Sequence, residues 1–220
     1  METRFQLHLI TDRTAVSDVS AAVAGALAGG VNWVQVREKS LPARDLYELA
    51  RRVGALCGAA GAGLIVNDRI DVALACGAHG AHLAGRSLPV AAARPLLTGG
   101  RVLGVSVHSL AEARAAEQAG ADYVTFGSIF PTRSHPGQPA AGLAELARVV
   151  EGVGIAVLAI GGITAANADQ VLATGCAGVA LISAVLGAPD PRRATTELRA
   201  ALDRSTYQPR FRFPPQGGVV

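Results

Sequence analysis

Eight short β-branched runs alternate with longer runs rich in Ala, Leu, Glu and Arg, and this repeat constrains the fold more than any other feature of the chain. Consecutive β-branched runs start about 24 residues apart, which is room for one strand, two loops and one helix. Eight such units predict a single-domain (β/α)₈ TIM barrel, because a doubly wound sheet would need long crossovers that this chain lacks. The expected strands begin near Leu7, Asn32, Gly63, Gly80, Val102, Asp122, Ile155 and Gly178.

The segments between the strands have helical periodicity, and several carry end signals. Ser109 is followed three residues later by Glu112, a capping-box spacing. We place the barrel at residues 1–204. Residues 205–220 are Pro-rich without a period, which predicts a flexible tail, with a lid or a dimer contact as alternatives. The expected helices cover residues 19–27, 43–57, 70–76, 89–97, 110–119, 143–150, 165–173 and 191–202.

The composition limits the classes of partner that we expect for this chain. The net charge of +3 is spread along the 220 residues and only 4% of them are aromatic, so we expect no nucleic-acid partner. The chain has no long uninterrupted apolar run and no signal peptide, so we expect no membrane partner. The three cysteines fit neither a disulfide framework nor a metal knuckle, which favours a cytoplasmic location. The oligomeric state stays open, a homo-oligomer included.

The active site of such a barrel lies at the carboxyl ends of its strands. At the end of the second strand, alternation places Gln35, Arg37 and Lys39 on one face, toward the barrel mouth. Two cations and an amide there indicate an anion clamp. The alternative is that Arg37 pairs with Glu38 or Asp68 while Lys39 is solvated.

Further polar residues follow the third, fifth and sixth strands. Two of them have structural alternatives, because Asp68 could cap the helix that begins near Ile70 and His108 could be a packed or capping residue. His79 and His82 form an HxxH pattern within a strand, but residues three apart face opposite sides, so we expect no metal there. The candidates at these strand ends are Asn67, Asp68, Ser106, His108, Ser128, Thr132, Ser134 and His135.

The seventh and eighth strands end in Gly161-Gly162 and Ile182-Ser183, each before a helix start. Backbone N–H groups of such turns bind phosphate, and this fold most often binds phosphate after strands seven and eight. We therefore predict a phosphate site at these four residues, with a plain tight turn as the alternative.

Across residues 7–202 the chain resembles the family of thiamine phosphate synthases and TenI-type thiazole tautomerases. The resemblance is carried by Gln35-Val-Arg-Glu-Lys39, Val66-Asn-Asp-Arg69, Gly127-Ser-Ile-Phe-Pro-Thr132, Ala159-Ile-Gly-Gly-Ile163 and Gly178-Val-Ala-Leu-Ile-Ser183. It implies that Gln35, Arg37, Lys39 and Asn67 hold the pyrophosphate of a pyrimidine substrate in a synthase. It also implies that a thiazole phosphate rests on the backbone of Gly162, Ile182 and Ser183.

The chain departs from the family pattern at three positions. Ser87 stands where a synthase has an acidic magnesium ligand, which would otherwise act beside Asp68. His135 stands where a synthase has a lysine, and Ser128 stands where the tautomerase has a histidine. Losing a hard oxygen ligand next to Arg86 disfavours Mg²⁺.

These departures lead us to expect a metal-free thiazole tautomerase that acts on thiazole carboxylate phosphate, with no cofactor. His135, Ser128 and Arg37 would do the chemistry, and Gln35, Lys39, Asn67, Ser106, Thr132 and Ser134 would bind substrate. One alternative is a synthase that joins hydroxymethylpyrimidine pyrophosphate to thiazole phosphate with Mg²⁺ at Asp68. Others are a non-catalytic phosphate-ligand binder or regulatory relative, and another phosphosugar enzyme on the same barrel.

Overall fold

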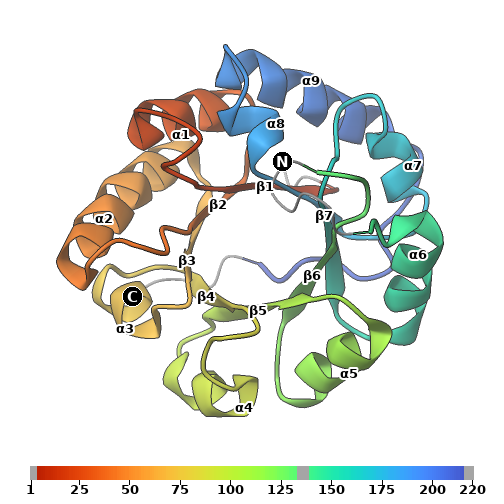
Figure 1. Cartoon of the computed structure of the whole chain (residues 1–220), viewed down its shortest axis with the longest axis horizontal. Helices are drawn as coiled ribbons and strands as arrows, with labels where there is room; N and C mark the ends of the chain where they lie inside the picture. The colour runs from red at the N-terminus through yellow and green to blue at the C-terminus, as the bar shows by residue number, and fades with distance from the viewer. Residues whose placement is uncertain (1–3, 133–138, 216–220) are drawn as a thin grey trace.

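Eight parallel strands close into one barrel in sequence order in the computed structural model, which describes residues 4–132 and 139–215. Figure 1 shows the ring of strands with the helices around its outside. The (β/α)₈ prediction is confirmed. The strands are β1 (Gln6–Ile10), β2 (Trp33–Val36), β3 (Gly63–Asn67), β4 (Gly80–Leu83), β5 (Val102–Val107), β6 (Tyr123–Gly127), β7 (Ala156–Ile160) and β8 (Gly178–Leu181).

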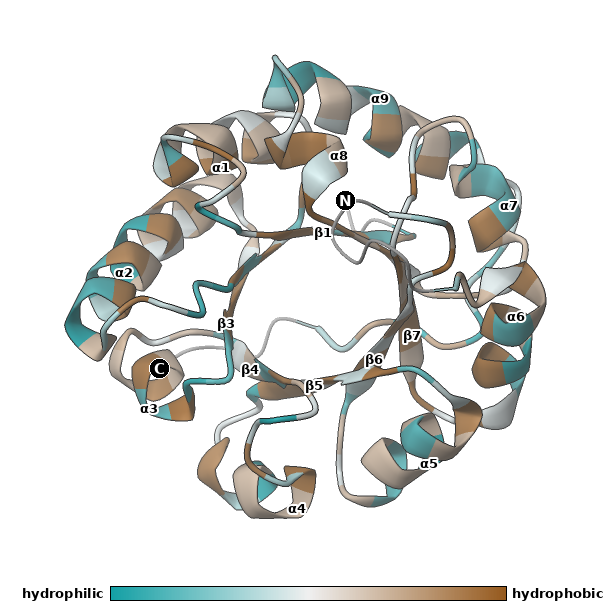
Figure 2. Ribbon diagram, in the orientation of Figure 1, coloured by the Kyte–Doolittle hydropathy of each residue, from teal (hydrophilic) through white to brown (hydrophobic). Residues whose placement is uncertain are grey.

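Most helices begin at the residue that the sequence predicts, and the Ser109 side chain caps its helix by accepting from the Glu112 backbone N–H at 3.1 Å. The apolar side chains of strands and helices form the core between the two layers, and Figure 2 shows hydrophobic residues concentrated on the strands. The helices are α1 (Val19–Ala28), α2 (Ala43–Ala60), α3 (Ile70–Ala75), α4 (Val90–Ala93), α5 (Leu110–Gln118), α6 (Gly142–Gly152), α7 (Ala168–Leu172), α8 (Ser183–Leu186) and α9 (Pro191–Arg204).

Three helical segments differ from the prediction. Residues 89–97 form α4 and then the 3₁₀ turn η1 (Arg94–Leu96), because Pro95 has no N–H with which to continue an α-helix. Helix α7 begins at Ala168, after a turn in which the Asn167 side chain accepts from the Thr164 N–H at 2.8 Å. The short helix α8 follows β8 directly, whereas the sequence indicated only a helix start there.

Alternate strand residues fill the barrel interior in layers. The layer near the amino ends of the strands is aromatic and apolar, with His8, Trp33 and Tyr123 in contact. The layer near the carboxyl ends is polar and lies at the base of an open pocket. The polar layer is formed by Gln35, Asn67, His82, Ser106 and Thr125.

The C-terminal segment differs from the flexible tail that we expected for residues 205–220. As far as it is described, this segment crosses the amino end of the barrel, and Phe213 is only 7% exposed. Its ring centroid lies 4.8 Å from that of His8 and 4.6 Å from that of Tyr123. Without this ring, the apolar layer of the barrel interior would be exposed to solvent at that end. Burial of an aromatic ring there is therefore favourable.

Among the described residues, no helix combines the length and the apolarity needed to cross a bilayer.

Candidate active site

A cavity of about 580 Å³ opens at the carboxyl ends of the strands. Every predicted site residue that the structure describes lines this cavity, apart from Asp68. These residues converge because parallel strands end on one rim. The predicted lining residues are Gln35, Arg37, Lys39, Asn67, Ser106, Ser128, Thr132, Gly161, Gly162, Ile182 and Ser183.

Arg37 and Lys39 form one wall of the cavity. Glu38 points away, because its carboxylate accepts from the Thr11 hydroxyl at 2.6 Å and from the Arg13 N–H at 3.1 Å. No ion pair of Arg37 with Glu38 or Asp68 occurs among the described residues. Arg37 and the partial burial of the ammonium group lower the pKa of Lys39. The wall is therefore an excess of positive charge turned toward the cavity.

Gln35 lies deeper on the same side and is almost completely buried. Its side-chain NH₂ donates to the Asn67 carbonyl oxygen at 3.0 Å. This contact directs the donors of Gln35 toward β3, so that its carbonyl oxygen is available to the cavity as an acceptor.

His82 lines the cavity beneath this rim, and sequence reasoning missed it. Its ring nitrogens lie 3.0 Å from the Tyr123 hydroxyl and 2.9 Å from the Ser106 hydroxyl. Burial lowers the pKa of His82 to about 3, so the ring is neutral at physiological pH. The register of the folded barrel places it there, because Asn67 and His82 are partners in β3 and β4 and therefore share an inward-facing layer.

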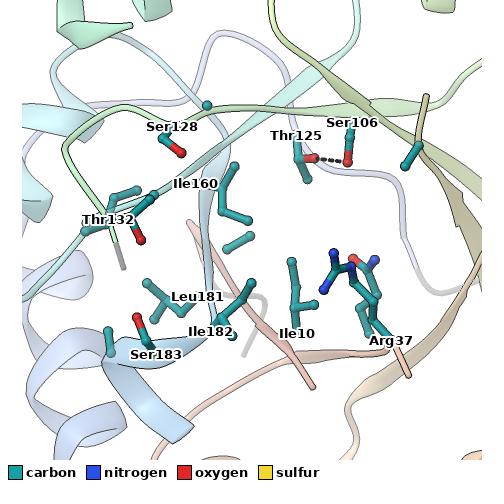
Figure 3. A pocket seen from close by; sticks show the side chains of 18 of the residues that line it. Ile10, Arg37, Ser106, Thr125, Ser128, Thr132, Ile160, Leu181, Ile182 and Ser183 are labelled. Atoms are coloured by element: carbon teal, nitrogen blue, oxygen red, sulfur yellow. Dashed lines mark hydrogen bonds between the residues drawn. The ribbon is translucent and has the colours of Figure 1, made fainter. Parts of the chain in front are cut away.

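The wall of the cavity that faces Arg37 and Lys39 is formed largely by backbone groups. Gly161 and Gly162 have φ values of 102° and 66°, in the region that favours glycine. A Cβ on Gly162 would lie 2.7 Å from Phe130 Cβ and 2.7 Å from the Pro131 carbonyl oxygen, so the turn packs tightly on the loop after β6. Asn167 holds the turn by donating to the Gly162 carbonyl oxygen at 3.0 Å. In Figure 3, Ser183 lies across the cavity from Arg37.

The segment after β6 contributes Ser128 and Thr132, both at the cavity. Ser134 and His135 lie outside the described residues. His108 also lines the cavity, and its Nδ1 lies 2.8 Å from the Gly127 carbonyl oxygen. Its backbone N–H donates to the Glu112 carboxylate at 2.7 Å.

Asp68 does not cap α3, since no side-chain cap bond exists at that helix start. It is the one described non-glycine residue with a positive φ, 65°, and its side chain is exposed at the end of β3. Asp tolerates this conformation better than most residues, but the position is strained, which is common at functional sites.

The donor set for a magnesium ion is sparse. The Ser87 hydroxyl is engaged with the Ala84 N–H at 2.8 Å, and no cluster of three His, Cys, Asp or Glu occurs among the described residues. Asp68 therefore fits Mg²⁺ as a single carboxylate ligand. Mg²⁺ is commonly bound by one or two carboxylates together with substrate phosphates, so this set suffices if the substrate supplies the remaining oxygens.

Fold and site together define a class: a small (β/α)₈ barrel whose pocket faces a cationic wall toward a glycine turn of the kind that binds phosphate. The family model described as thiamine monophosphate synthase matches residues 7–185. The chain therefore belongs to the thiamine monophosphate synthase family, which acts in thiamine biosynthesis.

Proteins of similar sequence match this chain over nearly its full length. A putative thiamine-phosphate synthase of Geobacter sulfurreducens is 50% identical over 206 residues, which is 92% of this chain and 96% of the relative. The thiamine-phosphate synthase of Pyrococcus furiosus is 42% identical over 92% of this chain and 97% of its own. A solved thiamine phosphate pyrophosphorylase of Pyrococcus furiosus superposes with a TM-score of 0.84 at 42% identity, covering 91% and 96% of the two chains.

These findings correct the functional prediction. The metal-free tautomerase is wrong, because the relatives with high identity are named thiamine-phosphate synthase. The prediction gave too much weight to single departures such as Ser87. A site in which substrate phosphates supply most of the oxygens tolerates the loss of one carboxylate.

Proposed function

We propose that this protein is a thiamine-phosphate synthase that joins hydroxymethylpyrimidine pyrophosphate to thiazole phosphate with Mg²⁺. The thiazole nitrogen forms a bond to the methylene carbon of the pyrimidine, and the bond from that carbon to the pyrophosphate oxygen breaks. The products are thiamine phosphate and inorganic pyrophosphate. The three unpaired cysteines support a cytoplasmic location as part of this proposal.

The observation that carries the proposal is one cavity with anion-binding groups on two facing walls. Arg37 and Lys39 offer charged donors on the first wall, suited to a pyrophosphate that gains charge as it leaves. The Gly161-Gly162 turn and Ser183 offer backbone N–H groups on the second wall, suited to a monophosphate. Two phosphorylated substrates held this way have their reacting groups between the walls.

Asp68 would hold the magnesium ion together with pyrophosphate oxygens. When bound, the ion would neutralise charge on the departing pyrophosphate. Arg37 and Lys39 keep that group oriented, and Gln35 and Asn67 fix the depth at which the pyrimidine sits.

The test is to incubate the purified chain with both substrates and Mg²⁺ and to quantify thiamine phosphate and pyrophosphate. We expect equal amounts of the two products and no reaction with excess EDTA. Asp68→Asn should lower kcat/KM by about 100-fold, as expected for a charged ligand. Asp71→Asn is the control, because Asp71 is exposed and pairs only with Arg69 among the described residues. Binding of both substrates without product would instead indicate a non-catalytic binder.

A further inference from the structure

A chain of hydrogen bonds runs under the cavity, from the aromatic layer of the barrel up to its polar layer. The Tyr123 hydroxyl contacts His82 Nδ1 at 3.0 Å, and His82 Nε2 contacts the Ser106 hydroxyl at 2.9 Å. Tyr123 and His82 are essentially unexposed, while Ser106 lines the cavity. The buried pair therefore reaches the cavity at the Nε2 edge of His82, where the Ser106 hydroxyl lies at 2.9 Å and the Thr125 hydroxyl at 3.4 Å.

The protonation states of the buried pair are defined by their surroundings. Burial lowers the pKa of His82 and raises the pKa of Tyr123, so both groups are neutral. A neutral imidazole has one donor nitrogen and one acceptor nitrogen, which leaves two possible arrangements of protons along the chain.

The environment of Tyr123 distinguishes the two arrangements. Among the described residues, His82 Nδ1 is the hydrogen-bond partner of the Tyr123 hydroxyl, while the rings of His8 and Phe213 and the apolar side chains of the barrel interior pack around the phenol without a hydrogen bond to it. If Nδ1 carried the proton, the tyrosine proton would be buried with no acceptor, which is unfavourable. The tyrosine hydroxyl therefore donates to Nδ1, and the proton of His82 resides on Nε2.

The consequence appears at Ser106. Its oxygen accepts from His82 Nε2 and, at 3.3 Å, from the Thr125 hydroxyl, the contact drawn in Figure 3. With both lone pairs engaged, the proton of Ser106 is directed into the cavity.

We propose that Tyr123 is a positioning residue: it holds His82 in the Nε2–H tautomer and so makes Ser106 a hydrogen-bond donor to the substrate. The pocket then selects a ligand that presents an acceptor at this depth, such as a ring nitrogen of a pyrimidine. This substrate assignment rests on the proposed function, whereas the tautomer assignment does not.

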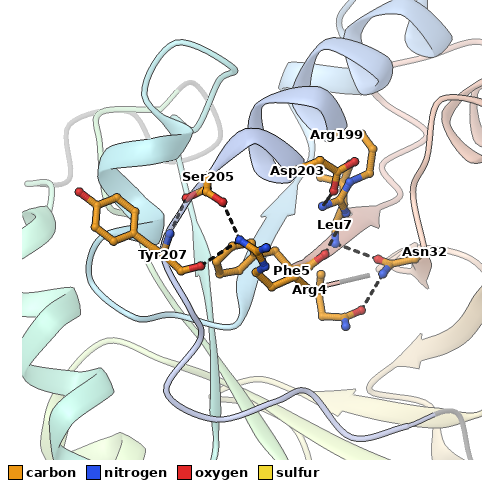
Figure 4. A network of polar contacts seen from close by, with 9 residues as sticks. Arg4, Phe5, Leu7, Asn32, Arg199, Asp203, Ser205 and Tyr207 are labelled. Carbon is orange, nitrogen blue, oxygen red and sulfur yellow. Dashed lines mark hydrogen bonds and ion pairs between the residues drawn. The ribbon is translucent and has the colours of Figure 1, made fainter. Parts of the chain in front are cut away.

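Tyr123 is held from two directions. Gly104 lies beside it, and a Cβ there would collide with both the phenol and His82 Nδ1. Phe213 of the C-terminal segment packs on its ring from below. Figure 4 shows how that segment is anchored near its start, where the Arg4 guanidinium donates to the carbonyl oxygens of Ser205, at 2.6 Å, and Tyr207. Residues from both chain ends thus support the floor of the pocket.

The first experiment measures the imidazole ¹⁵N resonances of the wild-type chain without ligand, with His82 assigned by a His82→Asn variant. We expect an acceptor-type Nδ1 and a protonated Nε2. A protonated Nδ1 would overturn the inference. This measurement requires neither a folded Tyr123 variant nor a bound substrate.

The second experiment measures the affinity for hydroxymethylpyrimidine pyrophosphate in Tyr123→Phe, in Ser106→Ala and in the double variant. Tyr123→Phe should weaken binding about 3- to 10-fold, the effect of one neutral hydrogen bond, and should add nothing once Ser106 is alanine. Tyr207→Phe is the matched control, because it removes a phenol hydroxyl from a half-exposed ring of the C-terminal segment.

Equal losses from Tyr123→Phe in both backgrounds would mean that Tyr123 only supports the fold, and would overturn the inference. A wild-type chain that does not bind the pyrimidine at all would contradict the proposed function instead, and the ¹⁵N result would still decide the tautomer.

Discussion

Arg37 and Lys39 share one wall of the pocket, and the charge of Arg37 makes the charge of Lys39 more difficult to retain. Arg37 is the largest influence that lowers the pKa of Lys39, with Arg86 a smaller one. A pyrophosphate bound between them would remove this repulsion. Both cations therefore favour an anion over an empty pocket.

Arg37→Ala should remove about 2–4 kcal/mol of transition-state stabilisation and so lower kcat/KM, because it removes a charged donor to the leaving group. Steady-state kinetics with both substrates measures this loss. Arg86→Ala is the control, since Arg86 also lowers the pKa of Lys39 but does not line the cavity. Equal losses in the two variants would mean that Arg37 acts only as a nearby charge.

Ser183→Asp should affect folding and binding differently. Ser183 is the first residue of α8 and lines the glycine-turn wall. A carboxylate at a helix start is compatible with the fold, but it repels a phosphate by about 2 kcal/mol or more, so thiazole phosphate should bind roughly 30-fold more weakly. Calorimetric titration with thiazole phosphate measures the affinity, and thermal unfolding measures stability.

Thr98→Asp is the control for that experiment, because Thr98 is exposed in the loop before β5, at the other end of the barrel. Unchanged thiazole phosphate affinity in Ser183→Asp would place the monophosphate elsewhere.

The C-terminal segment is an element of the fold, although its described residues, 205–215, contain no helix or strand. Phe213 closes the amino end of the barrel against His8, Trp33 and Tyr123. The Arg210 N–H also donates to the Gly175 carbonyl oxygen at 2.9 Å. The segment therefore contributes to stability through one buried ring and a few backbone contacts.

Phe213→Ala should reduce the free energy of unfolding by about 3 kcal/mol, the usual cost of truncating a buried phenylalanine. Urea unfolding measures the difference. Phe211→Ala is the control, because Phe211 lies two residues earlier and is only half-buried under Arg210. A loss no larger than that of Phe211→Ala would show that the ring does not close the barrel in solution.

The whole molecule should lose stability in mild acid. Burial lowers the pKa of His8 well below 6.5 and that of His82 to about 3. The unfolded chain takes up protons at both residues as pH falls below about 6.5, whereas the folded chain does not. Their contribution to stability is complete above pH 6.5 and is lost progressively as pH falls toward 3.

Between pH 7 and pH 5 each of these histidines should reduce the free energy of unfolding by about 2 kcal/mol. Urea unfolding at the two pH values measures the sum. His8→Phe keeps a ring in the aromatic layer and removes one titration, so it should reduce the difference by about half. An identical pH dependence in His8→Phe would show that His8 does not stay neutral in the folded state.

The sequence alone determined the architecture, because strand and helix signals are local. The strands from Gln6 to Leu181 and the starts of α1, α2, α3, α5 and α9 follow from periodicity, turns and caps. The rim residues followed from the same logic, since parallel strands closed into a barrel must end together. The sequence alone was enough to assign four residues to one pocket: Gln35, Arg37, Asn67 and Ser183.

The functional prediction failed because chemistry depends on how groups act together. Ser87 and His135 differ from the synthase pattern one residue at a time, and sequence reasoning treated each difference as a lost function. Relatives that are 42–50% identical over 92% of this chain are named thiamine-phosphate synthase, one of them as putative, and they indicate the synthase instead.

Only the tertiary structure decided which distant residues meet inside the barrel. His82 and Tyr123 are 41 positions apart and form one buried hydrogen bond. Phe213 belongs to a segment without any period, yet its ring packs against His8 at the other end of the chain. Such contacts depend on closure of the barrel, which brings all eight strands around one interior, and no local pattern in the sequence encodes them.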